Sequence, residues 1–176
     1  SEPQRQIAYI ASEPWTETKL AILRKYLSAY TTALKKHAFV TGYIDAFAGT
    51  GYRTQRDGDD AQLALPDLAD DESQALLKGS AALALETSPP FDRYVFIERD
   101  AARCKSLERL KTEYPALAPR IVVMPEEANA AIRSLCSKRW TNHRAVLFLD
   151  PYGMQVEWQT IEAVAATQKI DLWLLV

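Results

Sequence analysis

Cysteine and histidine are scarce in this chain, which contains two of each among its 176 residues. Cys104 and Cys136 show neither the dense, even arrangement of a disulfide scaffold nor the spacing of a zinc site. His37 and His143 offer no pairing for nucleophilic or zinc chemistry, so we expect surface histidines and no metal. These scarcities exclude a disulfide-stapled secreted protein and favour a reducing cytoplasm.

The sequence also lacks an excess of one charge and a long apolar run. Lys and Arg number 21 against 23 Asp and Glu, so no global basic field indicates nucleic acid. No apolar signal core opens the chain, and no run of about 18 apolar residues could span a bilayer. Because 48% of the residues are hydrophobic, residues 1–176 can bury a core as a single domain. We expect a cytoplasmic protein without a membrane partner.

An amphipathic pattern near the start of the chain predicts a helical extension over residues 12–38. Apolar residues recur there at spacings of three and four, which marks one buried helix face. The segment is also basic, and its charges are either a solvated face or a contact for phosphates. The apolar set is Leu20, Leu23, Leu27, Tyr30 and Leu34, and the basic set is Lys19, Arg24, Lys25, Lys35, Lys36 and His37.

Short apolar runs then alternate with helical segments. Runs of this kind are typical of parallel strands covered on both faces, so we predict a doubly wound, mainly parallel α/β sheet flanked by helices. Ligands of such sheets bind at the carboxyl ends of the strands. The last run reads as a core strand, from which we expect a further C-terminal portion to complete the sheet. The predicted strands are 42–47, 93–98, 120–124, 145–150 and 171–176, and the predicted helices are 79–86, 101–113, 128–139 and 158–167.

An acidic insertion over residues 53–77 interrupts this alternation. Acidic stretches of this kind resist packing, which favours a solvated insertion. Its position directly after a glycine-bearing loop keeps open a second interpretation, a lid over the site.

The glycine-bearing loop follows the first predicted strand and is the first candidate site. Asp45 lies near the end of that strand, and Phe47, Ala48, Gly49, Thr50 and Gly51 follow it. Glycine has no Cβ and accepts positive φ, so backbone there can approach a small ligand closely.

Acidic residues also follow the next two predicted strands. Glu98 stands where such folds bind the two hydroxyls of a ribose, although a helix N-cap or a surface acid would explain it equally well. Glu127, followed by Ala128 and Asn129, could accept a hydrogen bond from an adenine amino group or simply cap the next helix.

The fourth predicted strand ends in Asp150, Pro151, Tyr152 and Gly153. Proline biases Asp150 toward an extended conformation, and Tyr152 offers a flat face for a planar substrate. The alternative is an ordinary turn that closes the strand.

These motifs together resemble those of class I S-adenosylmethionine-dependent methyltransferases. The set consists of Asp45 to Gly51, Glu98, Glu127 to Asn129, and Asp150 to Gly153. With the leading helix and the long insertion, the chain resembles more closely the three-Cys-motif partner proteins, a bacterial family of that fold.

The resemblance implies a cofactor, a substrate class and roles for the site residues. Asp45 and the loop from Phe47 to Gly51 would hold the methionine end of S-adenosylmethionine, Glu98 with Arg99 the ribose, and Glu127 with Ala128 and Asn129 the adenine. Asp150, Pro151 and Tyr152 would face the substrate as catalytic residues. Phe47 in place of a first glycine is typical of enzymes that methylate exocyclic amino groups of nucleobases, and Asp150 to Gly153 is similar to the Asp-Pro-Phe-Gly of transfer-RNA guanine-N2 methyltransferases.

Three functions from different classes follow from these observations. The first is a methyltransferase on RNA or DNA. The second is a catalytically silent cofactor-binding or scaffold subunit that acts with a three-Cys-motif partner protein. The third, a nucleotide-dependent oxidoreductase, is weakened because residues 47–51 lack the third glycine of the dinucleotide fingerprint.

Overall fold

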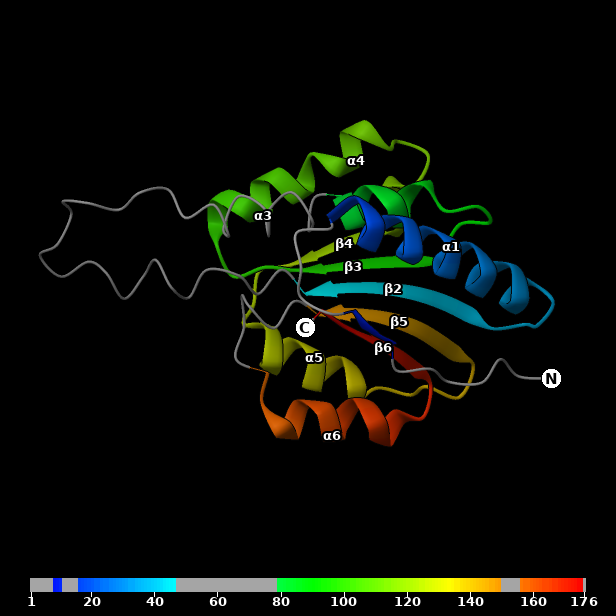
Figure 1. Ribbon diagram of the computed structural model, residues 1–176. Coiled ribbons are helices and arrows are strands. Elements are labelled where there is room, and N and C mark those ends of the chain that lie inside the picture. Colours follow the sequence, from blue (N-terminus) through cyan, green and yellow to red (C-terminus); the bar gives the residue numbers. More distant parts are fainter. Residues whose placement is uncertain (1–7, 11–15, 47–78, 150–155, 176) are drawn as a thin grey trace, which may run out of the picture.

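The computed structural model describes residues 8–10, 16–46, 79–149 and 156–175 of the chain (Figure 1). The predicted insertion over residues 53–77 lies outside these ranges, as do the glycine-bearing loop and the residues from Asp150 to Gly153.

A six-stranded sheet forms the centre of the molecule, and every neighbouring pair of its strands is parallel. Parallel strands need crossover connections, which place helices over both faces of the sheet. The predicted α/β class and the parallel sheet are therefore confirmed. In spatial order the strands are β1 (Ala8–Ile10), β6 (Ile170–Leu175), β5 (His143–Leu149), β2 (Val40–Ala46), β3 (Arg93–Ile97) and β4 (Ile121–Met124).

The helices form two layers, one on each face of this sheet (Figure 1). The α1 side carries α1 (Thr16–Lys35), the helical residues 79–86, α3 (Ala101–Glu108) and α4 (Leu110–Glu113). The α5 side carries α5 (Ala128–Cys136) and α6 (Trp158–Thr167). A short 3-10 helix, η1 (Ala118–Arg120), leads into β4. The three-layer arrangement is Rossmann-like.

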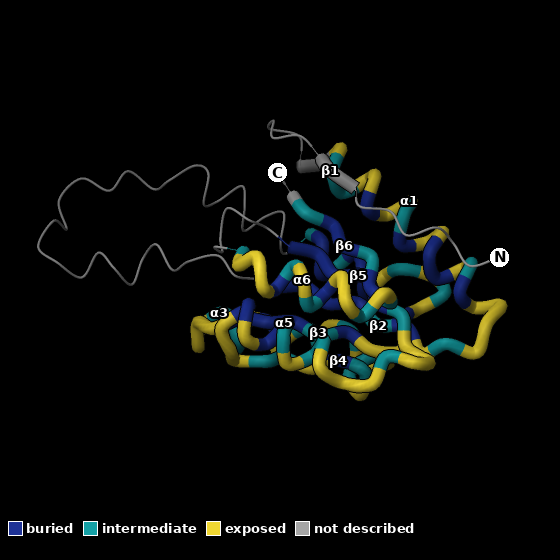
Figure 2. Tube along the Cα trace, turned by 90° about the horizontal axis from the view of Figure 1, so that it is seen from below, coloured by how far each residue is buried: buried dark blue, intermediate teal, exposed yellow. Residues whose placement is uncertain are grey.

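Side chains of the central strands alternate between two apolar cores. Tyr43 of β2 packs into the α1-side core, and the next residue, Ile44, packs into the α5-side core. In β5, Val146 and Leu147 divide in the same way. Successive strand side chains point to opposite faces, so burial of both faces requires the continuous apolar runs seen in the sequence. Figure 2 shows the central strands β2 and β5 as mostly buried, whereas the helices carry many exposed residues.

The apolar face predicted for the first helix is the face that α1 buries. Leu23, Leu27, Tyr30 and Leu34 are buried in the α1-side core, and Leu20 packs against it. This packing explains why spacings of three and four recur along α1.

Some boundaries differ from the sequence prediction. The segment predicted as one helix over residues 101–113 is divided between α3 and α4, and β1 was not predicted at all. β1 pairs with β6 beyond the predicted strands, at one edge of the sheet. Within the described part of the chain, no helix combines the length and the apolarity needed to cross a bilayer.

Candidate functional site

The strand order places a topological switch point between β2 and β5. From β2 the chain proceeds outward to β3 and β4, and it then returns to β5 on the other side of β2. Ligands of open α/β sheets bind in the crevice at such a point, outside the carboxyl ends of the strands. Ala46 and Leu149 are partners at those ends, so the glycine-bearing loop from Phe47 and the motif from Asp150 each follow a paired position in the sequence.

Asp45 lies beside this point and is fully buried, with 0% of its surface exposed. Its Oδ2 accepts hydrogen bonds from the Tyr43 hydroxyl at 3.0 Å and from the Ser80 hydroxyl at 2.9 Å. Burial and the adjacent carboxylate raise the pKa of Tyr43 well above its ordinary value, which keeps this hydroxyl a donor. Asp45 therefore joins the end of β2 to the helical residues 79–86.

Glu98 follows the last residue of β3 and is also buried, with 4% exposed. Its Oε1 accepts the backbone N–H of Asp100 at 3.0 Å. Burial raises the pKa of this carboxyl above its ordinary value. The N-cap of α3 is Asp100, whose side chain accepts from the backbone N–H of Arg103. The two ordinary explanations for Glu98, an N-cap and a surface acid, are therefore wrong.

Arg99 and Cys104 lie beside Glu98 in different ways. Arg99, predicted beside the ribose, is exposed. The Cys104 thiol of α3 donates to the backbone carbonyl of Glu98 at 3.1 Å. Cys104 and Cys136 are both half-buried free thiols.

Glu127 is exposed and is the N-cap of α5. Its Oε1 accepts the backbone N–H of Asn129 at 2.9 Å, and its Oε2 accepts that of Ala130 at 2.8 Å. Burial acts to raise the pKa of this carboxyl, but the hydrogen bonds from Ala130 and Asn129 together outweigh burial, and the pKa lies below its ordinary value. The capping role considered for Glu127 is confirmed.

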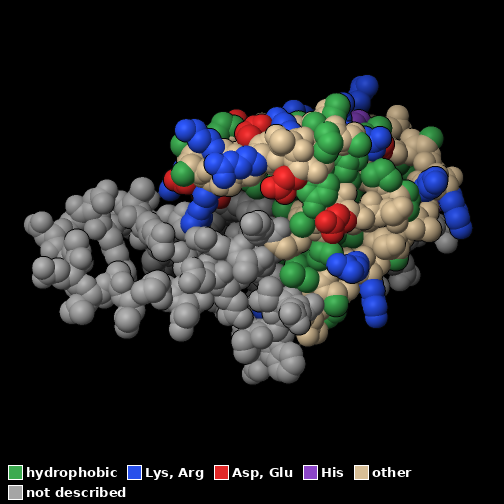
Figure 3. All heavy atoms as spheres, turned by 90° about the horizontal axis from the view of Figure 1, so that it is seen from above, with side chains coloured by type: hydrophobic (Ala, Val, Ile, Leu, Met, Phe, Trp, Pro, Cys, Tyr) green, Lys and Arg blue, Asp and Glu red, His purple; other side chains and the backbone are tan. Residues whose placement is uncertain are grey.

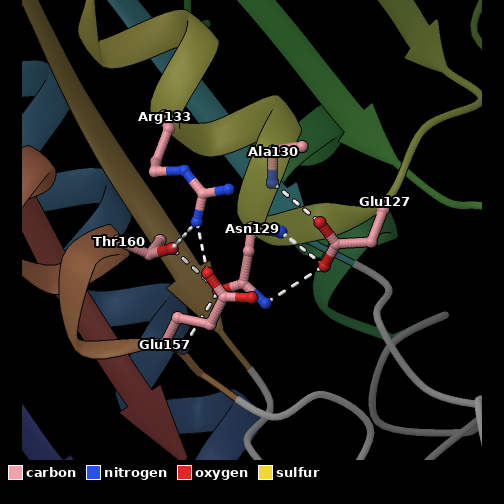
Figure 4. A network of polar contacts seen from close by, with 6 residues as sticks. All are labelled: Glu127, Asn129, Ala130, Arg133, Glu157 and Thr160. Carbon is pink, nitrogen blue, oxygen red and sulfur yellow. Dashed lines mark hydrogen bonds and ion pairs between the residues drawn. The ribbon is translucent and has the colours of Figure 1, made fainter.

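The side chain of Asn129 joins α5 to α6 (Figure 4). It is buried, with 4% exposed, and its Nδ2 donates to Glu127 Oε1 at 3.0 Å. Its Oδ1 accepts the Thr160 hydroxyl at 2.8 Å and the backbone N–H of Glu157 at 3.1 Å. Arg133 closes the network, since its Nη1 donates to both Glu157 and Thr160. This Asn129 network (Glu127, Asn129, Arg133, Glu157 and Thr160) fixes the chain where it re-enters the described structure after β5.

The remaining predicted residues divide into two groups. Ala128 is buried in the α5-side core. The other group lies outside the described residues and comprises Phe47, Ala48, Gly49, Thr50, Gly51, Asp150, Pro151 and Tyr152. The structure thus brings Asp45 and Glu98 to neighbouring strand ends and places Glu127 at the end of the strand beyond.

Sequence reasoning missed several residues that build this edge. Tyr43 stands two residues before Asp45 on the same strand face, so alternation could have paired them. Ser80 and Thr160 are far from their partners in the sequence and gave no local signal.

The basic residues predicted along the first helix are on the surface of the α1 side. Arg24, Lys25, Lys35, Lys36 and His37 are exposed. Figure 3 shows this side of the molecule, where Lys and Arg side chains lie at several separate places with acidic and apolar side chains between them. A contact between α1 and phosphates stays a prediction.

Comparison of the chain with protein-family models, with curated proteins and with solved structures found no match. The functional argument therefore depends on the site itself.

Proposed function

We propose that this protein is an S-adenosylmethionine-dependent methyltransferase that methylates an exocyclic amino group of a nucleobase in RNA or DNA. The observation that carries the proposal is a pair of buried carboxylates, Asp45 and Glu98, at the carboxyl ends of the adjacent strands β2 and β3. Buried carboxylates are rare unless a partner or a ligand requires them.

The described residues fit the cofactor best at Glu98 and Glu127. A carboxylate can accept about four hydrogen bonds, and Glu98 accepts backbone hydrogen bonds from Asp100 and Arg99, so it can also receive two ribose hydroxyls. Glu127 Oε2 accepts one backbone N–H and can receive an adenine amino group as well. In this scheme Asp45 fixes the beginning of the loop from Phe47 to Gly51, because its carboxylate is bound by Tyr43 and Ser80.

The residues after β5 supply the catalytic groups of the proposal. An exocyclic amine is a poor nucleophile because its lone pair is delocalised into the ring. Hydrogen bonds from that amine to the Asp150 carboxylate and the Pro151 carbonyl would localise the lone pair and stabilise the positive charge that develops on nitrogen. The cofactor supplies an electrophilic methyl group when bound. Tyr152 stacks on the base, which is flipped out if it belongs to a structured nucleic acid.

Calorimetry with S-adenosylmethionine, S-adenosylhomocysteine and NAD tests the cofactor half of the proposal. We expect binding of the first two, and Glu98→Gln should weaken it about tenfold or more, because hydrogen bonds to a charged group contribute about 1.5–3 kcal/mol. Glu162→Gln, on the exposed surface of α6, is the matched control and should bind like the wild type. Binding of NAD alone would favour an oxidoreductase, and binding of none would favour the scaffold subunit.

Methylation assays test the catalytic half. Asp150→Ala and Tyr152→Ala proteins that still bind the cofactor should lose most of their methylation of an RNA or DNA substrate. Wild-type rates in both variants would contradict the proposed roles.

A further inference from the structure

A pocket of about 240 Å³ lies at the amino-terminal edge of the sheet, at the opposite end of the strands from the candidate site. Val40, Arg93 and His143, the first residues of β2, β3 and β5, contribute to its lining. Its volume is below the range of about 300–1,000 Å³ that is typical of drug-sized ligands, so a single ring or a short chain fits it better than a whole dinucleotide.

The lining of this pocket combines an apolar interior with a basic rim. Ile44, Val95 and Leu135 pack with the α5-side core, and Trp140 lies beside them. The Trp140 ring meets the His143 ring edge to face, with 6.3 Å between centroids. The rim carries Arg93, Lys138, Arg139 and His143, all of them exposed, and none of the described lining residues is acidic.

Part of this positive charge has an ordinary explanation. Lys138 and Arg139 follow the last residue of α5, and basic residues there complement the helix dipole. Arg144, another lining residue, lies over the Phe39 ring at 3.9 Å from its centroid. Arg93 and His143 begin two different strands, so the helix dipole does not explain their position beside Lys138 and Arg139. Arg93 comes from β3, and Lys138, Arg139 and His143 come from the connection that leads from α5 into β5, so basic side chains from two separate segments converge on one apolar pocket.

We propose that this basic pocket (Arg93, Lys138, Arg139, Trp140 and His143) binds one nucleotide unit of a single-stranded nucleic acid. The base enters the apolar interior beside Trp140, and the flanking phosphates lie on the rim. Aromatic rings with neighbouring cations are the usual platform for single strands, where stacking contributes about 1–3 kcal/mol per base. An acidic peptide would satisfy the rim charges but would leave the aromatic pair unused.

The inference rests on the substrate class of the proposed function and adds a second contact to it. β2 spans the sheet from the pocket at Val40 to the candidate site at Ala46, and a strand of this length extends about 20 Å. Because α5 and α6 cover this face of the sheet, a substrate that reaches both ends of β2 has to pass around them and is longer than this direct distance. The pocket would hold one part of the strand while another part is presented at the switch point.

Fluorescence anisotropy with a short labelled oligouridylate tests the pocket in the full chain, without added cofactor. The Lys138→Glu, Arg139→Glu double variant should bind at least about tenfold more weakly. The slope of log K against log salt should also fall by about 1.4, because each single-strand phosphate that a cation neutralises accounts for about 0.7 of that slope. Lys105→Glu with Arg109→Glu makes the same charge change on the exposed surface of α3 and its C-cap, on the other side of the sheet, and should leave both quantities unchanged within about twofold.

A second variant distinguishes a loss of binding from a loss of folding. Arg93→Ala changes an exposed side chain and should weaken binding while the circular dichroism melt stays that of the wild type. Equal losses of affinity in the pocket and α3 variants, no loss in either, or tighter binding of a polyglutamate peptide than of the oligouridylate would each overturn the proposal.

The oligouridylate and cofactor experiments distinguish failure of the pocket from failure of the proposed methyltransferase function. Oligouridylate binding that the pocket variants abolish supports the pocket even if S-adenosylmethionine fails to bind and the methyltransferase is wrong. Cofactor binding without any oligouridylate binding overturns the pocket alone.

Discussion

Asn129 shows how one side chain can tie two helices together at one edge of the sheet. Each of its polar side-chain atoms is used within the Asn129 network, which ties α5 to the residues that lead into α6. The adenine role predicted for Asn129 stays a prediction.

Replacement of Asn129 tests this structural role. Asn129→Ala should lower the free energy of unfolding by about 2–3 kcal/mol, because it removes three hydrogen bonds and leaves the buried Thr160 hydroxyl with fewer partners. Urea denaturation measures the change. Ser134→Ala, on the exposed surface of α5, is the control and should stay within about 0.5 kcal/mol of the wild type. A destabilisation by Asn129→Ala as small as that of the control would contradict the role.

Glu127, the N-cap of α5, makes the stability of the protein depend on pH. Its folded-state pKa is lowered, so its stabilising effect is present above the pKa of the unfolded chain, about 4.3, and is lost as the pH falls through the folded-state value. Melting temperatures of the wild type and Glu127→Gln should differ near neutral pH and converge in acid. Glu162→Gln serves as the control for loss of one surface charge. A difference that stays constant down to strongly acid pH would show that the carboxylate charge at Glu127 is not what stabilises α5.

At the scale of whole elements, the sequence predicted those that bury continuous apolar faces. The spacing of Leu23, Leu27 and Leu34 is the helix period and predicted α1. The continuous apolar run from Ala145 to Leu149 predicted β5, and all five of these residues are buried. The predicted bounds of α6 agree with the structure. A strand that is buried on both faces needs a continuous apolar run, which can be read from the sequence. These runs were sufficient to predict a parallel sheet and the α/β class.

Elements and contacts set by distant residues could not be predicted in this way. β1 has only three residues, and it is a strand because β6 offers it a partner far along the chain. The bond from Ser80 to Asp45 joins residues whose proximity depends on how the helical residues 79–86 pack on β2. Motif reasoning placed Asp45 and Glu98 at adjacent strand ends, but it could not tell that both are buried.

At the scale of the whole molecule, the two cores share one sheet. Leu27 fills the α1-side core and Leu147 the α5-side core, and each is 0% exposed. Strands such as β2 contribute side chains to both cores. Loss of one core would therefore expose one face of the same strands whose other face forms the second core.

Unfolding should therefore be a single transition for both cores. Leu27→Ala and Leu147→Ala should each cost about 2–5 kcal/mol and shift the urea midpoint without changing the m-value. Circular dichroism and tryptophan fluorescence should report the same midpoint, because Trp173 packs in the α1-side core and Trp140 against the α5-side core. Ile22→Ala, at a residue that is 43% exposed on α1, is the control and should change little. Two separated transitions would show that the cores fold independently.

The place of β2 between β3 and β5 also determines when the sheet can form during synthesis. The β3 partners of β2 emerge about fifty residues after it, whereas Leu149, the β5 partner of Ala46, emerges about a hundred residues after Ala46. At about 5–20 residues per second, the other edge of β2 waits several seconds on the ribosome. An unpaired strand edge of that duration is a natural binding site for chaperones, so the strand at the centre of the finished fold is itself open to misassembly while the chain is made.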